Sequence, residues 1–442
     1  MKTAIKFINH ASVIVTDGVI SILSDPWFFG DIFNKGWSLL HEASIEEVNI
    51  ILDEITHIWI SHEHPDHFSI PFFKSFAKKL KDNNIKIFIQ KTKDRRVFNF
   101  LNNLDLSIHE LDFNKKLYIS KDFNLTCIKD GFYDSGLLIE SHSEKILNLN
   151  DCEVRSHKRI NEVFAITGNV DVLLTQFSYA AWKGGLKNKK WRVDAAREKI
   201  ETMKLQIEKF RPKYVIPFAS FVYFSNFDNF YLNDSVNVPL DMIADFKNSS
   251  SRLVFMAPGD VLRGRVEFPD QDRAVEFWSC KYKNIKPINN FQKIDLTLIR
   301  QSFEKYCTRI SQNNNLQLMR IIRVISPIKL FGPVVIGLDD LNVKLKFDYI
   351  DKIFVLTDEP EFLSMKSESL DFIFRNSFGF DTLTVNGCFE EKSQDGFLNS
   401  TKTLAIENLN NMGIKFNFGI FFNMSIIRIF ISRLRGVVKR LA

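Results

Sequence analysis

Three histidines and an aspartate occur within one short segment of the chain, His62-Glu63-His64-Pro65-Asp66-His67. The run Thr56–Ile60 before it is rich in apolar residues and predicts a buried strand, and a helix is expected to begin near Pro71. The segment should therefore lie on a loop between a strand and a helix. In an extended loop its first two histidines point the same way, while the aspartate and the last histidine can face the same point from the other side. This spacing predicts a site for two adjacent metal ions rather than a polar turn.

The histidine-rich segment resembles the signature of the metallo-β-lactamase superfamily, and other segments extend the resemblance. Asn9–Val15 and Leu23–Trp27 are similar to the paired N-terminal strands of the branch that contains lactonase-like enzymes and the metal-binding domain of CMP-N-acetylneuraminate hydroxylases. The similarity to the hydroxylase family continues in order through Leu147–Cys152, Ile216–Ala219 and Met256–Asp260. The resemblance implies an αββα sandwich, in which two sheets pack face to face with helices outside.

Alternating β-rich and helical runs agree with this α/β (α+β) architecture. Strands are predicted at Ile5–Ile8, Val13–Val15, Ile20–Leu23, Ile85–Ile89, Leu125–Ile128, Leu137–Ile139, Lys145–Leu149, Val172–Thr175 and Tyr214–Pro217. Helices are predicted at Pro71–Asp82, Arg95–Leu101 and Asp194–Phe210. Because 442 residues exceed one ordinary core, we expect a metallo-β-lactamase-like catalytic domain over residues 1–265 and a smaller α+β domain over residues 266–422.

The remaining elements belong to the expected C-terminal parts. In the α+β domain we predict helices between Leu296 and Val324, strands at Val334–Ile336, Val343–Phe347 and Lys352–Leu356, a helix at Ser367–Phe374, and a strand and turn at Phe380–Gly387. Residues 423–442 have the pattern of a basic amphipathic helix. Such a helix can lie on an anionic membrane surface, dock on its own domain, or pack on a second subunit of a homo-oligomer.

The composition is typical of a folded protein in a reducing compartment. Hydrophobic residues make up 45% and charged residues 25% of the sequence, and the net charge of +6 suits a small anionic substrate or a membrane surface without requiring nucleic acid. The five cysteines are scattered and form no CxxC pair, which also argues against a Rieske iron–sulfur cluster. We find neither a signal peptide nor a membrane-spanning segment. A cytoplasmic location is expected, with peripheral contact at the inner membrane face as an extension of it.

The predicted metal ligands are His62, His64, Asp66, His67, Asp130 and Asp151. The resemblance implies that Asp151 bridges the two ions. The superfamily places another histidine between the loop and this bridging residue, but this chain has none there, so Asp130 is the first substitute and Asp134 the second. The last histidine of the superfamily is also missing, and Asp260 can offer an oxygen instead. Two divalent cations are expected, either zinc or, because the set is rich in carboxylates, iron or manganese.

Other residues are predicted to contact the substrate. His10 begins a strand that should end near the metal ions, which suits a supporting or substrate-contact role. The loop Phe177–Gly185 combines aromatic rings, a cation and glycines, and it is similar to a Gly-rich segment of the hydroxylase family. The expected substrate contacts are His10, Tyr179, Trp182, Lys183 and Asp260, with Arg192 as a further anion contact. The alternative for this loop is a surface loop with hydrophobic anchors.

Three functions are compatible with these residues. The first is hydrolysis of an anionic phosphoester, lactone or nucleotide sugar by a metal-bound hydroxide, with Asp66 as the catalytic residue that holds the hydroxide and delivers a proton to the leaving group. The second, which the resemblance implies, is iron-dependent hydroxylation of a CMP-sialic-acid-like amino sugar with electrons from an external donor. The third is a degenerate, non-catalytic scaffold in glycan assembly, because two superfamily histidines are missing.

Overall fold

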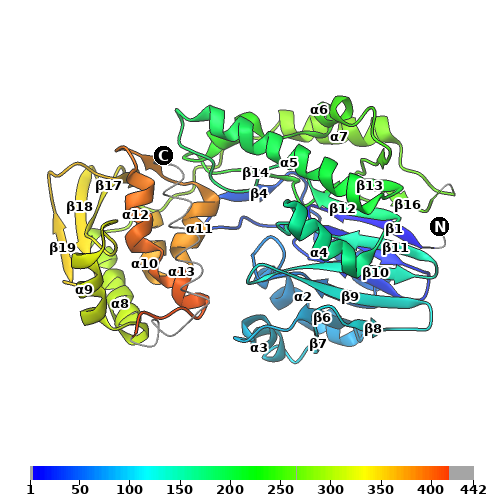
Figure 1. Ribbon diagram of the computed structural model, residues 1–442, viewed down its shortest axis with the longest axis horizontal. Helices are drawn as coiled ribbons and strands as arrows, with labels where there is room; N and C mark the ends of the chain where they lie inside the picture. Colours follow the sequence, from blue (N-terminus) through cyan, green and yellow to red (C-terminus); the bar gives the residue numbers. More distant parts are fainter. Residues whose placement is uncertain (1–2, 265, 418–442) are drawn as a thin grey trace. The chain divides into compact units, whose positions relative to one another are not determined.

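The computed structural model describes residues 3–264 and 266–417, and the chain divides into two compact units (Figure 1). The first unit comprises residues 1–225 and 230–287, and the second comprises residues 226–229 and 288–442. The expected domain boundary at residue 265 therefore precedes a helix, α7 (Gln271–Lys283), that is part of the first unit. The reason is packing, because Ala274, Val275 and Trp278 of this helix are buried in the core of the first unit.

Two seven-stranded sheets form the first unit. One sheet has the order β16 (Val261–Leu262), β1 (Ala4–Asn9), β2 (Ser12–Thr16), β3 (Ser21–Ser24), β5 (His57–Ile60), β6 (Lys86–Gln90) and β7 (Ser107–Leu111). The other has the order β15 (Arg252–Leu253), β13 (Tyr214–Phe218), β12 (Val172–Gln176), β11 (Glu144–Asn148), β10 (Asp134–Ser141), β9 (Phe123–Asp130) and β8 (Lys116–Tyr118). A short pair, β4 (Trp37–Leu39) and β14 (Val222–Phe224), completes the unit.

The strands of the first sheet bury both of their faces. Val13, Val15 and Trp59 belong to a core cluster shared with strands of the second sheet. The neighbouring Ile14 and Ile58 belong to a separate cluster with helices α1 (Ile45–Glu54) and α2 (Ile70–Asp82). Side chains of a strand alternate between its two faces, so one face packs on the other sheet and the other face on helices. This arrangement confirms the predicted αββα sandwich.

Helices cover the outer faces of the two sheets (Figure 1). Their bounds are α1 (Ile45–Glu54), α2 (Ile70–Asp82), α3 (Arg96–Asn102), α4 (His157–Thr167), α5 (Lys189–Phe210), α6 (Pro239–Asp245) and α7, with a 3-10 turn at Phe230–Ser235. The sequence did not predict α1 or α4. Helix α1 nevertheless carries a capping box, in which Ser44 and Glu47 satisfy each other's backbone N–H groups.

The second unit is a smaller α+β domain around a five-stranded sheet. Its strands, in sheet order, are β19 (Ile353–Leu356), β18 (Val343–Asp348), β17 (Val334–Leu338), β20 (Leu363–Met365) and β21 (Glu390–Glu391). Its helices are α8 (Leu296–Asn313), α9 (Leu316–Ile325), α10 (Ser367–Arg375), α11 (Gly379–Asn386), α12 (Gly396–Leu404) and α13 (Ile406–Asn411). Helices and a mixed sheet thus make up the second unit, with other bounds than the expected 266–422.

One element of the second unit differs from its prediction. The expected strand and turn at Phe380–Gly387 is helix α11, which buries Phe380, Leu383 and Asn386 at a helical spacing. Gly387 ends it with φ 66°, a left-handed conformation that glycine adopts without steric cost. The β-branched residues suggested a strand, but the i, i+3, i+6 burial pattern shows that packing outweighed their intrinsic propensity.

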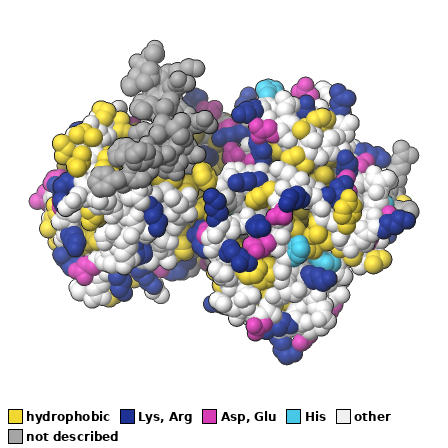
Figure 2. Space-filling model, turned by 60° about the horizontal axis from the view of Figure 1, so that its bottom comes forward, with side chains coloured by type: hydrophobic (Ala, Val, Ile, Leu, Met, Phe, Trp, Pro, Cys, Tyr) yellow, Lys and Arg dark blue, Asp and Glu magenta, His cyan; other side chains and the backbone are white. Residues whose placement is uncertain are grey.

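None of the helices in the described part of the chain is long and apolar enough to cross a membrane. The predicted amphipathic helix at residues 423–442 lies outside the described residues. On the face of the molecule drawn in Figure 2, Lys and Arg side chains are dispersed among acidic and apolar ones.

Candidate metal centre

The histidine-rich loop follows β5 directly and leads into α2, as predicted. Backbone N–H groups of His67 and Phe68 both donate to the carbonyl of His64, at 2.9 and 2.7 Å, which folds the loop into a tight turn. Ser69 then caps α2 by accepting a hydrogen bond from the N–H of Phe72. The turn is therefore held by its own backbone, and its histidine and aspartate side chains are left to face the sites described below.

Three groups of potential ligands meet around this turn, and each group has its donor atoms within 4.8 Å of one another. The groups are His62, His64 and Asp134; His62, His67 and Asp151; and His10, Asp66 and His67. Asp134 begins β10, Asp151 follows β11, and His10 lies in the turn between β1 and β2. Residues from both sheets thus converge on the loop.

The first group, His62, His64 and Asp134, lies on the more open side of the centre. His62 Nε2 is 2.9 Å from His64 Nδ1 and 3.8 Å from Asp134 Oδ1. The side chain of His62 is fully buried, whereas that of Asp134 is 25% exposed. Solvent can therefore reach the centre past Asp134.

Asp151 is oriented by a chain of polar contacts. Its Oδ1 accepts a hydrogen bond of 3.0 Å from Gln176 Nε2, and Gln176 Oε1 accepts one from Lys199. The other oxygen, Oδ2, lies 3.4 Å from His67 Nε2. Lys199 and Gln176, which the sequence analysis did not single out, thus turn one oxygen of Asp151 toward the histidines.

Asp25 supports the centre through hydrogen bonds with Ser61 and His67. Its carboxylate is fully buried and accepts from the Ser61 N–H at 2.7 Å, from Ser61 Oγ at 2.8 Å and from His67 Nδ1 at 2.8 Å. A carboxylate on one ring nitrogen fixes the tautomer and leaves the other nitrogen free to bind a metal. The sequence places Asp25 directly after the apolar run of β3, but its contact with His67 depends on the parallel pairing of β3 with β5.

The charges of the centre are strongly coupled. Burial lowers the pKa of His67, but the carboxylates of Asp66, Asp25 and Asp151 outweigh burial and hold this pKa well above its usual value. Burial and the neighbouring His67 and His64 hold the pKa of His62 well below its usual value. Burial, opposed by His64 and reinforced by Asp151 and Asp130, raises the pKa of Asp134 to about 6.

A cation would satisfy atoms that the protein leaves without partners. Asp66 Oδ1 and His67 Nε2 are buried, and no described residue forms a hydrogen bond with either atom. Buried polar atoms are almost always paired, so such orphans call for an explanation such as an ion. Imidazole nitrogens and carboxylate oxygens are the donors that zinc, iron and manganese bind. The residues therefore fit a metal centre.

Asp134, and not Asp130, lies in these groups, although the sequence favoured Asp130. Asp130 Oδ1 accepts from Arg159 Nε of α4 at 2.8 Å, and its Oδ2 accepts from the N–H of Glu153 at 2.6 Å. Both oxygens are thus used, and Arg159 balances the buried charge. The two aspartates face each other across the β9–β10 hairpin, so only the tertiary structure separates their roles.

We expect Asp134→Asn to weaken metal binding and Asp130→Asn to leave it unchanged. The first change removes a candidate ligand, whereas the second removes an ion pair and should cost about 1–3 kcal/mol of folding stability. Metal content after dialysis and chemical denaturation of the metal-free proteins measure the two effects. The assignment is contradicted if Asp130→Asn loses metal while Asp134→Asn retains it.

Three of the predicted substrate residues contact other parts of the protein. The Tyr179 hydroxyl donates to the carbonyl of Leu232, and Trp182 is buried with its ring edge-on to Trp191 at 5.4 Å. Asp260 contacts Arg273 and accepts from the N–H of Ala257 at 2.8 Å. These contacts hold the segments that carry Tyr179, Trp182 and Asp260 against neighbouring segments.

Two cations of the predicted substrate region have different surroundings. Arg192 is buried, pairs with Asp234 and donates to the carbonyl of Gly185 at 2.8 Å. Lys183 is partly buried, and burial together with the nearby Lys199 lowers its pKa. Because Lys199 contacts Gln176 and thereby Asp151, Lys183 remains a candidate anion contact near the centre.

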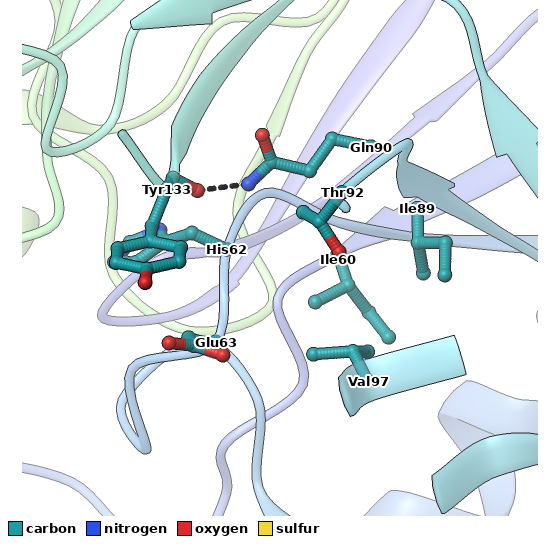
Figure 3. A pocket seen from close by; sticks show the side chains of 8 residues that line it. All are labelled: Ile60, His62, Glu63, Ile89, Gln90, Thr92, Val97 and Tyr133. Atoms are coloured by element: carbon teal, nitrogen blue, oxygen red, sulfur yellow. Dashed lines mark hydrogen bonds between the residues drawn. The ribbon is translucent and has the colours of Figure 1, made fainter. Parts of the chain in front are cut away.

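A small recess lies beside His62 (Figure 3). It has a volume of about 20 Å³ and is lined by His62, Glu63, Gln90, Thr92, Tyr133 and apolar side chains. Gln90 Nε2 donates to the carbonyl of Tyr133, a contact drawn in Figure 3, and to that of Ser61 at 2.8 Å. A space of this volume accommodates one water molecule and is too small for a sugar.

Curated proteins similar to this chain are cytidine monophosphate-N-acetylneuraminic acid hydroxylases. The chain is 27% identical to that of Danio rerio over 236 residues, which is 50% of this chain and 38% of the relative. It is 28% identical to that of Cricetulus griseus over 261 residues, which is 55% of this chain and 44% of the relative. The chain thus spans less than half the length of these relatives. No family model matches the sequence.

Several solved structures are similar at low identity. CmlA, a diiron β-hydroxylase from Streptomyces venezuelae, has a TM-score of 0.41 and 14% identity, covering 59% of this chain and 54% of that chain. The metallo-β-lactamase fold protein YhfI from Bacillus subtilis has a TM-score of 0.41 and 11% identity, covering 59% and 99%. Igni18, a metallo hydrolase from Ignicoccus hospitalis, has a TM-score of 0.39 and 15% identity, covering 59% and 97%.

The architecture and the curated relatives both agree with the resemblance found in the sequence. Two face-to-face sheets with outer helices carry a histidine-rich loop at a strand end. The segments that suggested the resemblance lie in the first unit, where several of them surround the loop. The chain has the αββα sandwich that its resemblance to the metallo-β-lactamase superfamily implied, and it is similar to the CMP-N-acetylneuraminic acid hydroxylases over about half of its length.

Proposed function

We propose that the chain is a metal-dependent hydrolase that acts on an anionic substrate of the phosphoester, lactone or nucleotide-sugar type. The observation that carries the proposal is the convergence of His62, His64, His67, Asp66, Asp134 and Asp151 in overlapping groups with orphaned donor atoms. Two divalent ions held there would lower the pKa of water and polarise the bond that is cleaved.

Asp66 is an ionised carboxylate with one oxygen that accepts no hydrogen bond from the described residues. Burial raises its pKa, but contacts with His67 and His10 outweigh burial and hold the pKa well below its usual value. The side chain is therefore ionised near neutral pH, and its Oδ1 has no hydrogen-bond partner. We propose that Asp66 accepts the proton of the attacking water and passes it to the leaving group.

Positive charge near Asp151 supports an anionic substrate. Lys199 reaches Asp151 through Gln176, and burial together with the nearby Lys199 lowers the pKa of Lys183. The chain as a whole carries a net charge of +6. A phosphate or carboxylate would gain from these ammonium groups while its reacting bond faces the histidines.

A second candidate function is hydroxylation, and two observations favour it. The curated relatives are named as hydroxylases of a cytidine monophosphate sugar, and the candidate ligand set includes three carboxylates, which suits iron. Such a reaction inserts one atom of O₂ into a C–H bond and reduces the other to water. It needs two electrons from a separate donor, for example a ferredoxin-like protein.

Metal analysis and two assays distinguish the candidates. The full chain is purified without added metal, and its zinc, iron and manganese contents are measured. We expect zinc or manganese, together with hydrolysis of bis(p-nitrophenyl) phosphate, a lactone or a CMP-sugar that is at least about 100-fold slower in Asp66→Asn. Bound iron, oxygen consumption with a chemical reductant and no hydrolysis would instead support the hydroxylase.

A further inference from the structure

His10 is buried in the centre with a ring that has no hydrogen-bond partner. The side chain is 1% exposed, and both Nδ1 and Nε2 are without partners among the described residues. Its backbone is well held, because its N–H donates to Asn9 Oδ1 at 2.9 Å and its carbonyl accepts from the N–H of Ala219 at 2.9 Å. The turn between β1 and β2 thus fixes the backbone of His10, while its ring nitrogens form no hydrogen bond with the described residues.

The ring of His10 faces two other unsatisfied side chains. His10 Nε2 lies 3.5 Å from Asp66 Oδ2, and the same oxygen lies 3.3 Å from His67 Nε2. Asp66 Oδ1 and His67 Nε2 are also without hydrogen-bond partners. Edge-on contact with Trp27, at 5.7 Å between ring centres, limits the rotation of the His10 ring.

We propose that His10 is a metal ligand and that it completes, with Asp66 and His67, a second cation position beside that of His62, His64 and Asp134. Asp151 lies within reach of His62 and His67 and is placed to contact both positions. The proposal rests on the metal-dependent function proposed above. It replaces the missing late histidine with one from the first β-turn of the chain.

A purely structural role explains His10 less well. A buried histidine that only packs normally has at least one ring nitrogen bonded, because burying an unpaired polar atom costs folding free energy. One carboxylate and two imidazoles, in contrast, form a donor set that zinc and iron(II) bind. One ion would give a partner to Nε2 of His10, to Nε2 of His67 and to the Asp66 carboxylate.

The test is the number of Co²⁺ ions that the full chain binds. We expect two per chain in the unmodified protein and one in His10→Phe, which keeps a ring but removes both donors. The visible Co²⁺ spectrum of the remaining ion should persist in His10→Phe. His10→Asp, which supplies an oxygen donor, should recover part of the second equivalent.

His41→Gln is the matched control, because His41 lies in none of the three ligand groups. It should bind two ions. Thermal unfolding with and without Co²⁺ separates a ligand from a packing residue, since loss of a ligand reduces the stabilisation by the ion and not only the stability of the metal-free chain.

The outcomes separate the two proposals. Two ions bound by His10→Phe, with an unchanged spectrum, would overturn the role of His10 and leave the metal-dependent function in place. If the second ion is lost in His10→Phe and the unmodified chain hydrolyses none of the substrates tested, His10 is a ligand and the proposed hydrolysis is contradicted. A chain that takes up no Co²⁺ overturns both.

Discussion

Replacing His62 with Ala is expected to lower the affinity of the chain for Zn²⁺ or Co²⁺ by more than about 100-fold. His62 belongs to two of the three ligand groups, and its Nε2 lies 2.9 Å from His64 Nδ1. Loss of an outer partner of a ligand typically costs 10–100-fold in affinity, and loss of a direct donor should cost more. Competition with a chromophoric chelator measures the change.

His142→Ala is a suitable control for this prediction. His142 belongs to none of the ligand groups, and its side chain is 28% exposed. Its replacement should leave affinity and stoichiometry unchanged. If His62→Ala remains folded by circular dichroism and binds two ions as tightly as the unmodified chain, the proposed centre is wrong.

Asp25→Ala should destabilise the metal-free chain by about 3–5 kcal/mol, the cost of breaking a buried charged pair. The change leaves the N–H and hydroxyl of Ser61 and Nδ1 of His67 without their acceptor in a fully buried position. It should also reduce metal affinity by about 10–100-fold, because His67 loses the group that orients its ring. Urea denaturation and chelator competition measure the two effects.

Asp25→Asn separates orientation from charge. The amide oxygen can still accept from Ser61, but the side chain no longer offers His67 a negative charge. We expect a smaller loss of stability than in Asp25→Ala and a similar loss of metal affinity. An Asp25→Asn protein with unchanged metal affinity would show that this carboxylate supports the fold alone.

The predicted elements were most accurate where local pattern and packing agree. The strand before the histidine-rich loop and the helix after it appear as β5 and α2. Helix α1 was missed although Ser44 and Glu47 form a recognisable capping box. Helix α11 was predicted as a strand because β-branched residues were weighted above the helical spacing of its buried residues.

In the candidate centre, too, sequence spacing alone could not assign every residue. Asp130 and Asp134 are both acidic and flank one hairpin, so spacing alone could not separate them. Arg159, on a helix that the sequence did not predict, binds Asp130 and leaves Asp134 for the centre. Asp25 lies in the segment Leu23–Trp27 that suggested the resemblance, but its role was not predicted. Its contact with His67 depends on the pairing of β3 with β5.

The sequence by itself determined the chemistry of this protein: a compact run of imidazoles and a carboxylate whose spacing is set by the backbone of one loop. Asp151 and His10 were expected near that loop from the resemblance and the strand pattern, but only the tertiary structure decided that Asp25 and Asp134 join it. His10, Asp25, Asp134 and Asp151 come from different strand ends, and their approach depends on strand pairing and on the packing of two sheets. Local spacing does not encode such contacts, because they form between residues far apart in the chain.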